Sequence, residues 1–406
     1  AKGERNMKVL MLSWEYPPHM VGGLGQHVYD ITRYLVRQGV EPHIITPRVE
    51  NQPDHETLDG VCIHRVGNPI SEASPDDFKG WTFTFNSEAI REAVRLNSQT
   101  GGFDIIHAHD WMVAYAGRSV SKIFSVPLIT TIHATEYGRN LGLHNRTQRE
   151  INEIEKNLAL EADQIICCSQ YMQDEICSLF GVRREAIKII PNGVEPEQFV
   201  ELPENPQIEF DPREKALVFL GRLVPEKGVW QLLHCFPRVL ESVPEAKLYI
   251  VGRGPQKKIL EQRAQKLGIE KKIVFTGFIR EKDRNYVYHQ AKAAVFPSLY
   301  EPFGIVALEA MATRTPAIVS EVGGLSEIVV HRQTGLKVPP GHESKLAEAI
   351  IEILSDDGLA RQLTDNAVRM IESVYNWNHI AGSTIDVYNE VTARIKAKKT
   401  GRSSVG

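Results

Sequence analysis

Apolar segments that read as buried strands alternate with amphipathic helical segments along almost the whole chain, and this alternation is what most constrains the fold. In the first cycle, Lys8–Ser13 reads as a buried strand and Leu24–Gln38 as a helix with one apolar face. Strands that alternate with helices build parallel sheets that are covered on both faces. The sequence therefore predicts an α/β protein with doubly wound parallel sheets.

The alternation runs in two series with a break between them. Residues 194–214 are rich in proline and acidic residues and have no periodicity, so we interpret them as a linker. A chain of 406 residues is also too long for a single core. We therefore predict two Rossmann-like domains, residues 7–200 and 201–375. Ligands in such folds bind at the carboxyl ends of the strands.

Both ends of the chain are predicted to be disordered. Residues 1–6 lack the apolar region of a signal peptide, and residues 396–406 are basic and then rich in Gly and Ser. No run of about 18 apolar residues occurs, so no membrane span is expected. The five cysteines show no C-x-x-C spacing, which favours buried thiols in the cytoplasm.

Charge is distributed unevenly between the two halves. Residues 1–200 carry 19 Lys and Arg against 26 Asp and Glu, a net charge of −7, and the remainder carries 28 against 25, a net charge of +3. A basic second half suits an anionic ligand. The acidic first half argues against nucleic acid and against peripheral contact with an anionic membrane.

Two glutamates eight residues apart, Glu301 and Glu309, flank a predicted helix start. Pro302 suits the first turn of a helix, and Gly304 lets a ligand approach the backbone. The N–H groups of Phe303, Gly304 and Ile305 would then point outward at the positive end of the helix dipole. The segment predicts a site for a phosphorylated sugar with a carboxylate at each end.

Two loops that follow first strands carry further signals for a phosphate ligand. Arg222 and Lys227 lie five residues apart in a loop tightened by Pro225 and Gly228, so both cations can converge on one anion. In the first half, Gly22 and Gly23 join a strand to a helix, where small residues admit a diphosphate.

Polar residues also end two strands of the first half. His109, Asp110 and Trp111 follow one strand and could bind sugar hydroxyls and stack on a pyranose, or could simply cap the strand and pack in the core. His133 follows the next strand, where a lone histidine is more often structural. No metal-ligand spacing and no G-x-S-x-G motif occurs, so neither a metal site nor a serine hydrolase is predicted.

These motifs together resemble the retaining glycosyltransferases of the GT-B fold, family 4 (GT4), and in particular the glycogen and starch synthases. The segments that carry the resemblance are Gly22-Gly23, Gly221–Gly228 and the Glu301/Glu309 pair, and Pro191–Val194 is similar to the hinge of that family. The resemblance covers residues 7–395. It implies two domains that face each other across a cleft, and a C-terminal helix, residues 376–395, that returns to the first domain.

The resemblance also implies roles for the site residues. Arg222 and Lys227 would bind the diphosphate, Glu309 the ribose, and Glu301 the hexose. Arg253, Phe278 and Ile279 would lie around the base, and the carbonyl of His133 would face the anomeric carbon. The other implied donor contacts are Gly22, Gly23, Phe303, Gly304 and Ile305, and the implied acceptor contacts are His109, Asp110 and Trp111.

The resemblance implies transfer of a hexose, glucose in this case, from ADP- or UDP-glucose to a saccharide. The implied mechanism is a front-face attack that needs neither a metal ion nor a separate cofactor. The chain departs from many glucan synthases because Pro17–Val21 contains no lysine before Gly22. Two alternatives stay open: a lipid or secondary-metabolite acceptor, and an epimerase or sensor that binds nucleotide sugars without transfer. Residues 1–200 lack the basic charge expected of a lipid-facing enzyme.

Overall fold

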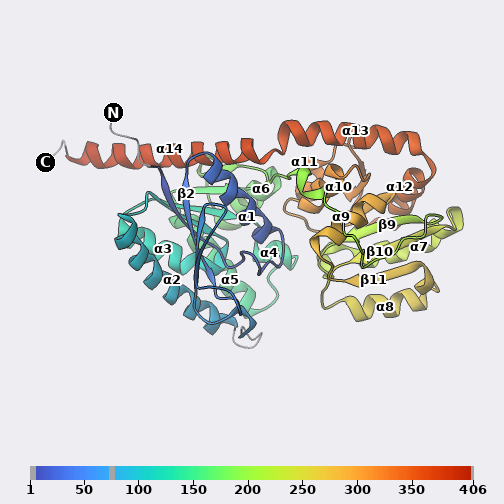
Figure 1. Ribbon diagram of the computed structural model, residues 1–406, viewed down its shortest axis with the longest axis horizontal. Helices are drawn as coiled ribbons and strands as arrows, with labels where there is room; N and C mark the ends of the chain where they lie inside the picture. The colour runs from blue at the N-terminus through green and yellow to red at the C-terminus, as the bar shows by residue number, and fades with distance from the viewer. Residues whose placement is uncertain (1–5, 73–77, 404–406) are drawn as a thin grey trace. The chain divides into compact units, whose positions relative to one another are not determined.

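The computed structural model describes residues 6–72 and 78–403, and the chain divides into two compact units, whose elements are labelled in Figure 1. Unit 1 comprises residues 1–192 and 377–406, and unit 2 comprises residues 193–376. Residues 1–5 and 404–406 of the predicted tails lie outside the described residues. Among the helices of the described residues, none has a stretch long and apolar enough to cross a bilayer.

Unit 1 is built on an eight-stranded sheet in the order β3-β4-β2-β1-β5-β6-β7-β8. All neighbouring strands are parallel except β3 and β4. The strands are β1 (Lys8–Leu12), β2 (Glu41–Pro47), β3 (His55–Leu58), β4 (Val61–Val66), β5 (Ile105–His109), β6 (Leu128–Ile132), β7 (Gln164–Cys167) and β8 (Ile187–Ile189).

The sheet of unit 1 separates two hydrophobic cores. Successive residues of β1 alternate between them, with Val9 and Met11 in one core and Leu10 and Leu12 in the other. Helices α1 (Gly23–Arg37) and α14 (Trp377–Ser403) cover the first face, and α2 (Phe78–Thr100), α3 (Ala114–Phe124) and α5 (Arg146–Glu161) cover the second (Figure 1). The remaining helical segments are η1 (Ile70–Glu72), η3 (Trp111–Val113), α4 (Glu136–Arg139), α6 (Gln170–Phe180) and η4 (Arg184–Ala186).

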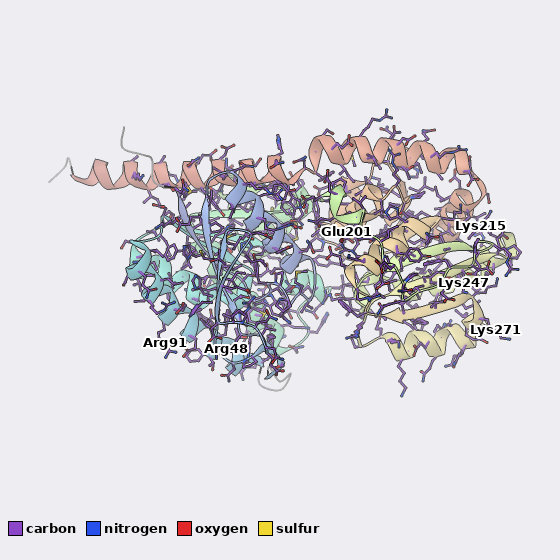
Figure 2. The ribbon with its side chains drawn as sticks, in the orientation of Figure 1. Arg48, Arg91, Glu201, Lys215, Lys247 and Lys271 are labelled. Carbon is purple, nitrogen blue, oxygen red and sulfur yellow. The ribbon has the colours of Figure 1, made fainter. Side chains whose placement is uncertain are left out.

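Unit 2 contains a six-stranded, fully parallel sheet in the order β11-β10-β9-β12-β13-β14. The strands are β9 (Lys215–Leu220), β10 (Ala246–Val251), β11 (Ile273–Gly277), β12 (Ala293–Phe296), β13 (Ala317–Ser320) and β14 (Leu336–Val338). The helical segments are η5 (Pro196–Phe199), η6 (Pro225–Lys227), α7 (Val229–Ser242), α8 (Lys257–Lys266), η7 (Glu270–Lys272), α9 (Glu281–Gln290), α10 (Ile305–Ala312), α11 (Gly323–Ile328), α12 (Glu343–Ser355) and α13 (Asp357–Val374). Charged side chains such as Lys271 of unit 2 and Arg91 of unit 1 lie at the surface (Figure 2).

The predicted domain boundary after residue 200 is wrong, because residues 193–200 belong to unit 2. The N–H of Val194 donates to the carbonyl of Tyr375 over 3.0 Å. The side-chain amide of Asn285 donates to the carbonyl of Gln198 over 2.8 Å, and the Arg284 guanidinium lies over the ring of Phe199. These contacts tie the segment to unit 2 although its sequence resembles a linker.

In the structure α14 extends to Ser403, beyond residue 395, where the sequence-based prediction ended this helix. Lysine and alanine at positions 396–399 favour the helix.

Three elements of unit 1, β3, β4 and α2, are absent from the sequence-based prediction. The segment Trp81–Phe85 alternates apolar and polar residues with the period of a strand, yet it lies within α2. Packing decides the outcome, because Trp81 and Phe85 are buried four residues apart while Phe83 is exposed. β14 of unit 2 is likewise missed, as a strand of three residues leaves too short a pattern.

Candidate active site

In unit 2 the two predicted donor-binding loops follow neighbouring strands at the centre of the sheet. From β9 the chain proceeds to β10 and β11 on one side, and from β12 it proceeds to β13 and β14 on the other. The strand order therefore reverses between β9 and β12, which is where ligands bind in open α/β sheets. The loop after β9 carries Arg222 and Lys227, and the loop after β12 carries Glu301.

Lys227 and Glu301 form an ion pair at this point. The ammonium of Lys227 lies 2.6 Å from Oε2 of Glu301, and the side chains are 19% and 9% exposed. The hydroxyl of Ser298 donates to the same oxygen over 3.2 Å. Arg222 instead pairs loosely with Glu226, at 3.5 Å, and its guanidinium is half exposed. The structure thus joins Lys227 to Glu301 and leaves Arg222 accessible beside them.

A backbone contact holds these two loops together. Gly228 has φ +69°, and a Cβ atom there would lie 1.9 Å from the carbonyl oxygen of Pro297. Since that oxygen belongs to the main chain, it cannot move away cheaply. Gly228 therefore sets the distance between the Lys227 loop and the Glu301 loop.

Gly228→Ala is expected to destabilise unit 2 by more than about 3 kcal/mol, because steric overlap adds to the cost of positive φ. The matched control is Gly268→Ala, since Gly268 has the same φ of +69° but has open space within 4 Å of the position that a Cβ atom would take. The control should cost only about 1–2 kcal/mol. Urea unfolding of both variants measures the difference, and equal losses would contradict the proposed overlap.

The start of α10 is shaped by close packing with the loop after β13. Gly304 has φ +105° and precedes the first helical residue, Ile305. The N–H of Gly324 donates to the carbonyl of Glu301 over 2.9 Å, and a Cβ on Gly324 would lie 2.4 Å from the backbone of Phe303. The first N–H groups of α10 have no partner within the helix. Sequence reasoning missed the Gly323-Gly324 pair, although two glycines after a strand were a usable signal.

Glu309 is held by two residues of α9 that sequence reasoning also missed. Its Oε1 accepts from the guanidinium of Arg284 over 3.2 Å, and its Oε2 accepts from the hydroxyl of Tyr288 over 3.1 Å. Burial, and then the Glu309 charge, raise the pKa of Tyr288 well above its usual range, so the phenol stays a donor. The four-residue spacing of Arg284 and Tyr288 on a predicted helix was the only signal.

The residues expected around the base lie near one edge of the sheet. Arg253 stacks over the ring of Phe278 at 5.4 Å, and that ring is 67% exposed, whereas Ile279 is buried. A Cβ on Gly252 would lie 1.9 Å from the carbonyl oxygen of Gly221. A glycine is therefore required at position 252 because the loops after β9 and β10 approach each other closely there. It is not part of a dinucleotide-binding fingerprint.

In unit 1 the ends of β5 and β6 bring the predicted histidines together. Nδ1 of His109 lies 3.1 Å from Nε2 of His133, and the ring of His27, on α1, lies 4.8 Å from that of His133. Nδ1 of His27 is 2.6 Å from Oδ1 of Asn192, in the segment that resembles a hinge. Burial lowers the pKa of His27 and of His133 to about 3, so both imidazoles are neutral near pH 7.

Asp110 links the two strand ends. It has φ +60°, and one carboxylate oxygen accepts from the N–H of His133 over 2.7 Å while the other accepts from Arg139 over 3.1 Å. Arg139 also lies 3.7 Å from Glu155, whose pKa burial raises to about 8. Sequence reasoning missed Arg139 and Glu155.

Two predictions for unit 1 need correction. Trp111 is only 8% exposed and packs in the core, with its ring edge-to-face with Phe78, so it is not a stacking surface for sugar. At the start of α1, Oε2 of Glu15 accepts from the N–H groups of Val21 and Gly22, over 2.8 and 3.0 Å. A carboxylate of the chain thus fills the position that was predicted for diphosphate beside Gly22, while Gly23 is exposed.

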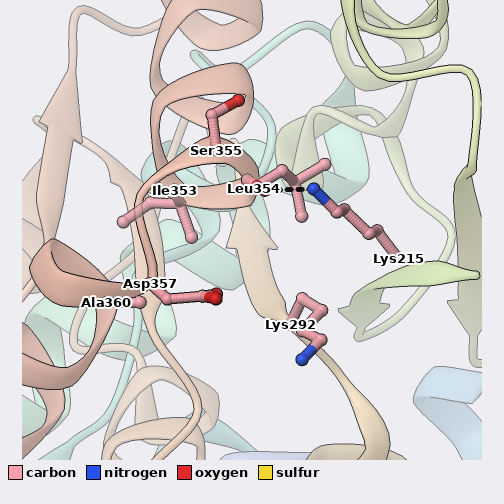
Figure 3. Close-up of a pocket in the computed structure, with 7 residues that line it drawn as sticks. All are labelled: Lys215, Lys292, Ile353, Leu354, Ser355, Asp357 and Ala360. Atoms are coloured by element: carbon pink, nitrogen blue, oxygen red, sulfur yellow. Dashed lines mark hydrogen bonds between the residues drawn. The ribbon is translucent and has the colours of Figure 1, made fainter.

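A hollow at the opposite end of the unit 2 sheet is separate from these loops (Figure 3). Lys215 begins β9 and Lys292 directly precedes β12, so both lie at the amino ends of the strands. Nζ of Lys215 donates to the carbonyl of Leu354 over 2.7 Å (Figure 3). No residue predicted for the donor site lines this hollow.

Comparisons with known proteins agree over nearly the whole chain. The family model described as Glycosyltransferase Family 4 matches residues 21–198, and that described as Glycosyl transferases group 1 matches residues 203–370. An uncharacterized glycosyltransferase of Methanocaldococcus jannaschii is 37% identical over 94% of this chain and 98% of its own length. Glycogen synthase of Mycobacterium tuberculosis is 34% identical over 94% of each chain.

Two solved structures have the same fold. Sucrose-phosphate synthase from Thermosynechococcus elongatus superposes with a TM-score of 0.81 at 25% identity, over 96% of this chain and all of that one. The catalytic domain of starch synthase IV from Arabidopsis thaliana, bound to ADP and acarbose, has a TM-score of 0.78 at 17% identity, again over 96% and 100%. These likenesses confirm the predicted GT-B fold.

Proposed function

The chain belongs to the family 4 glycosyltransferases, and we propose that it transfers glucose from ADP- or UDP-glucose to a saccharide acceptor with retention of anomeric configuration. The observation that carries this proposal is the mostly buried Lys227–Glu301 ion pair where the strand order of unit 2 reverses. Similarity to a glycogen synthase, and to a starch synthase whose structure holds ADP and acarbose, supports a nucleotide sugar as donor and a glucan as acceptor.

In the proposed reaction, the bond between C1 of glucose and the diphosphate breaks while the acceptor oxygen bonds to C1 from the same face. The proton of the acceptor hydroxyl passes to the departing phosphate oxygen. Lys227, Arg222 and the N–H groups at the start of α10 stabilise the charge that develops on the diphosphate. Because these groups supply the electrostatic stabilisation, the proposed mechanism requires neither a metal ion nor a protein nucleophile.

Glu301 and Glu309 have positioning roles in this proposal. Glu301, already hydrogen-bonded by Ser298, would exchange Lys227 for hydroxyls of the hexose when the diphosphate draws the ammonium away. Glu309 would accept from ribose hydroxyls while Arg284 and Tyr288 keep its carboxylate in place. In unit 1, the carbonyl of His133 would serve the acceptor side, while His109 and Asp110, which are buried and bonded to His133, would hold that residue in position.

A neutral carbohydrate is the acceptor that the charge distribution favours. The first half carries a net charge of −7, which would repel an anionic lipid surface. Action in the cytoplasm is part of the proposal, and five free cysteines suit a reducing compartment.

The proposal is tested by incubating the full chain with ADP-, UDP- or GDP-glucose, with and without maltooligosaccharides, and measuring nucleotide release and glucan length. One of the first two donors should support glucan extension, and that donor should also raise the melting temperature, because it binds the native state. Binding without acceptor extension would favour a sensor or an epimerase. Absence of binding by every nucleotide sugar would contradict the donor site itself.

A further inference from the structure

Two histidines and a glutamate converge in unit 1 outside the candidate active site. His55 lies on β3, His64 on β4 and Glu92 on α2, all of them elements that the sequence-based prediction missed. Nδ1 of His55 is 3.3 Å from Nδ1 of His64. Oε1 of Glu92 is 3.8 Å from the first of these nitrogens and 3.6 Å from the second. None of the three residues has a part in the proposed transfer reaction.

These separations match those of ligands around a single ion. Zinc binds imidazole nitrogen at about 2.0–2.1 Å and carboxylate oxygen at about 2.0–2.2 Å, so tetrahedral ligand atoms lie roughly 3.3–3.5 Å apart. A triangle with the observed sides has a centre roughly 2.1 Å from each corner, which is a zinc–ligand bond length. Small side-chain adjustments would therefore complete three metal bonds.

A chain of hydrogen bonds orients His64 for this task. Its Nε2 lies 3.2 Å from Nδ1 of His43, and Nε2 of His43 lies 3.2 Å from Oε1 of Glu41. If Nε2 of His64 donates to His43 and Nε2 of His43 donates to Glu41, the Glu41 carboxylate accepts the last hydrogen bond of this chain. The lone pair on Nδ1 of His64 then faces His55 and Glu92. Metal-binding histidines are held in this way, with the second ring nitrogen bonded toward a carboxylate.

The three side chains are accessible enough from the solvent for an ion to enter and for a fourth ligand to bind it. The side chain of His55 is 54% exposed, whereas those of His64 and Glu92 are mostly buried. Arg95 is the competing partner, because its Nε lies 2.8 Å from the other oxygen of Glu92, Oε2, and its Nη2 also contacts Oε1. An ion could replace the contact at Oε1 while the bond to Oε2 stays.

We propose that His55, His64 and Glu92 bind one divalent transition-metal ion, and that the ion fastens the edge strand β3 to α2. Two imidazoles and one carboxylate suit zinc better than magnesium or calcium, which prefer oxygen ligands alone. Within the part of the chain that the structure describes, β3 is the outermost strand of the sheet and pairs with β4 alone, so a bond to α2 adds a second attachment. The role of the ion is structural.

The test is calorimetric titration of zinc chloride into the chelator-treated full chain, together with thermal melting. The native chain should bind zinc in the micromolar range or tighter, and its melting temperature should rise by mass action. The His55→Ala variant, altered at an exposed position, should bind one equivalent of zinc less than the native chain. The rise in melting temperature that this equivalent causes should also be lost. Glu41→Gln should weaken the same equivalent by about 10–100-fold, because it releases the chain that orients His64.

Two control variants locate the effect. His144→Ala removes an exposed histidine elsewhere in unit 1 and should leave zinc binding unchanged. His133→Ala disrupts the second group of candidate ligands, His27, His109 and His133, and the equivalent lost in His55→Ala should persist in it. Unchanged zinc binding in His55→Ala, or a native chain that binds no zinc at a concentration of about 100 μM, would overturn the proposal.

Discussion

Replacing Lys227 with alanine is expected to slow sugar transfer by about 10²–10³-fold, which is the usual cost of removing one group that stabilises a developing negative charge. The Lys227 ammonium lies 2.6 Å from Glu301, at the point where the strand order reverses. Of the two cations predicted to bind the diphosphate, Lys227 is less exposed than Arg222. The effect should fall on kcat more than on KM, since the charge on the diphosphate grows as it leaves. Steady-state kinetics with the best donor measures both.

Lys345→Ala is the matched control, because Lys345 pairs with Glu348 at 2.7 Å on the surface of the same unit. That variant should keep near-native rates. A Lys227→Ala enzyme with comparable kcat would refute the role given to the ammonium.

The same substitution should lower stability, and a double variant separates the two effects. Lys227→Ala leaves the Glu301 carboxylate mostly buried, with Ser298 as its remaining side-chain partner among the described residues, which costs on the order of 3 kcal/mol. Adding Glu301→Gln removes the unpaired charge, so part of the stability should return while transfer stays slow. Recovery of activity together with stability would mean that the ion pair is structural only.

Acidification is expected to destabilise unit 1 strongly. His27 and His133 have native pKa values of about 3 and take up protons near their ordinary value of 6.5 once unfolded. Between these values the unfolded chain binds more protons, so stability falls as pH falls. The slope is about 1.4 kcal/mol per pH unit for each histidine. Burial lowers the pKa of His107 and of His109 in the same direction.

Glu155 acts in the opposite direction over part of this range. Burial raises its native pKa to about 8 from 4.5, so this group alone makes stability fall as pH rises from 4.5 to 8. Between pH 4.5 and 6.5 one carboxyl thus offsets part of the histidine effect. Glu155→Gln should remove the offset and steepen the loss of stability in that window.

Urea unfolding at pH 7, 6 and 5 followed by tryptophan fluorescence measures both effects. Trp14, Trp81, Trp111 and Trp377 belong to unit 1 and only Trp230 to unit 2, so a Trp230→Phe background reports unit 1 alone. His27→Asn should reduce the slope with pH. A native chain with equal stability at pH 7 and pH 5 would show that these histidines are not neutral in the folded state.

The sequence alone determined the fold class, most strands and the loops that carry the chemistry. The apolar periodicity that identifies a strand or a helix spans only about five to fifteen neighbouring residues, so it can be recognised in the sequence. A parallel strand must also end at the same edge of the sheet as its neighbours. That rule is sufficient to place Lys227 and Glu301, 74 residues apart in the chain, at one end of the unit 2 sheet. It also places His109 and His133 together in unit 1.

Only the tertiary structure decided which partners these side chains have. Arg284 and Tyr288 hold Glu309, Glu15 occupies the start of α1, and Trp111 turns into the core. The zinc site that we propose is of the same kind, since β3, β4 and α2 supply one ligand each. A contact of this sort depends on the distance between side chains from different elements, and no local pattern encodes that distance.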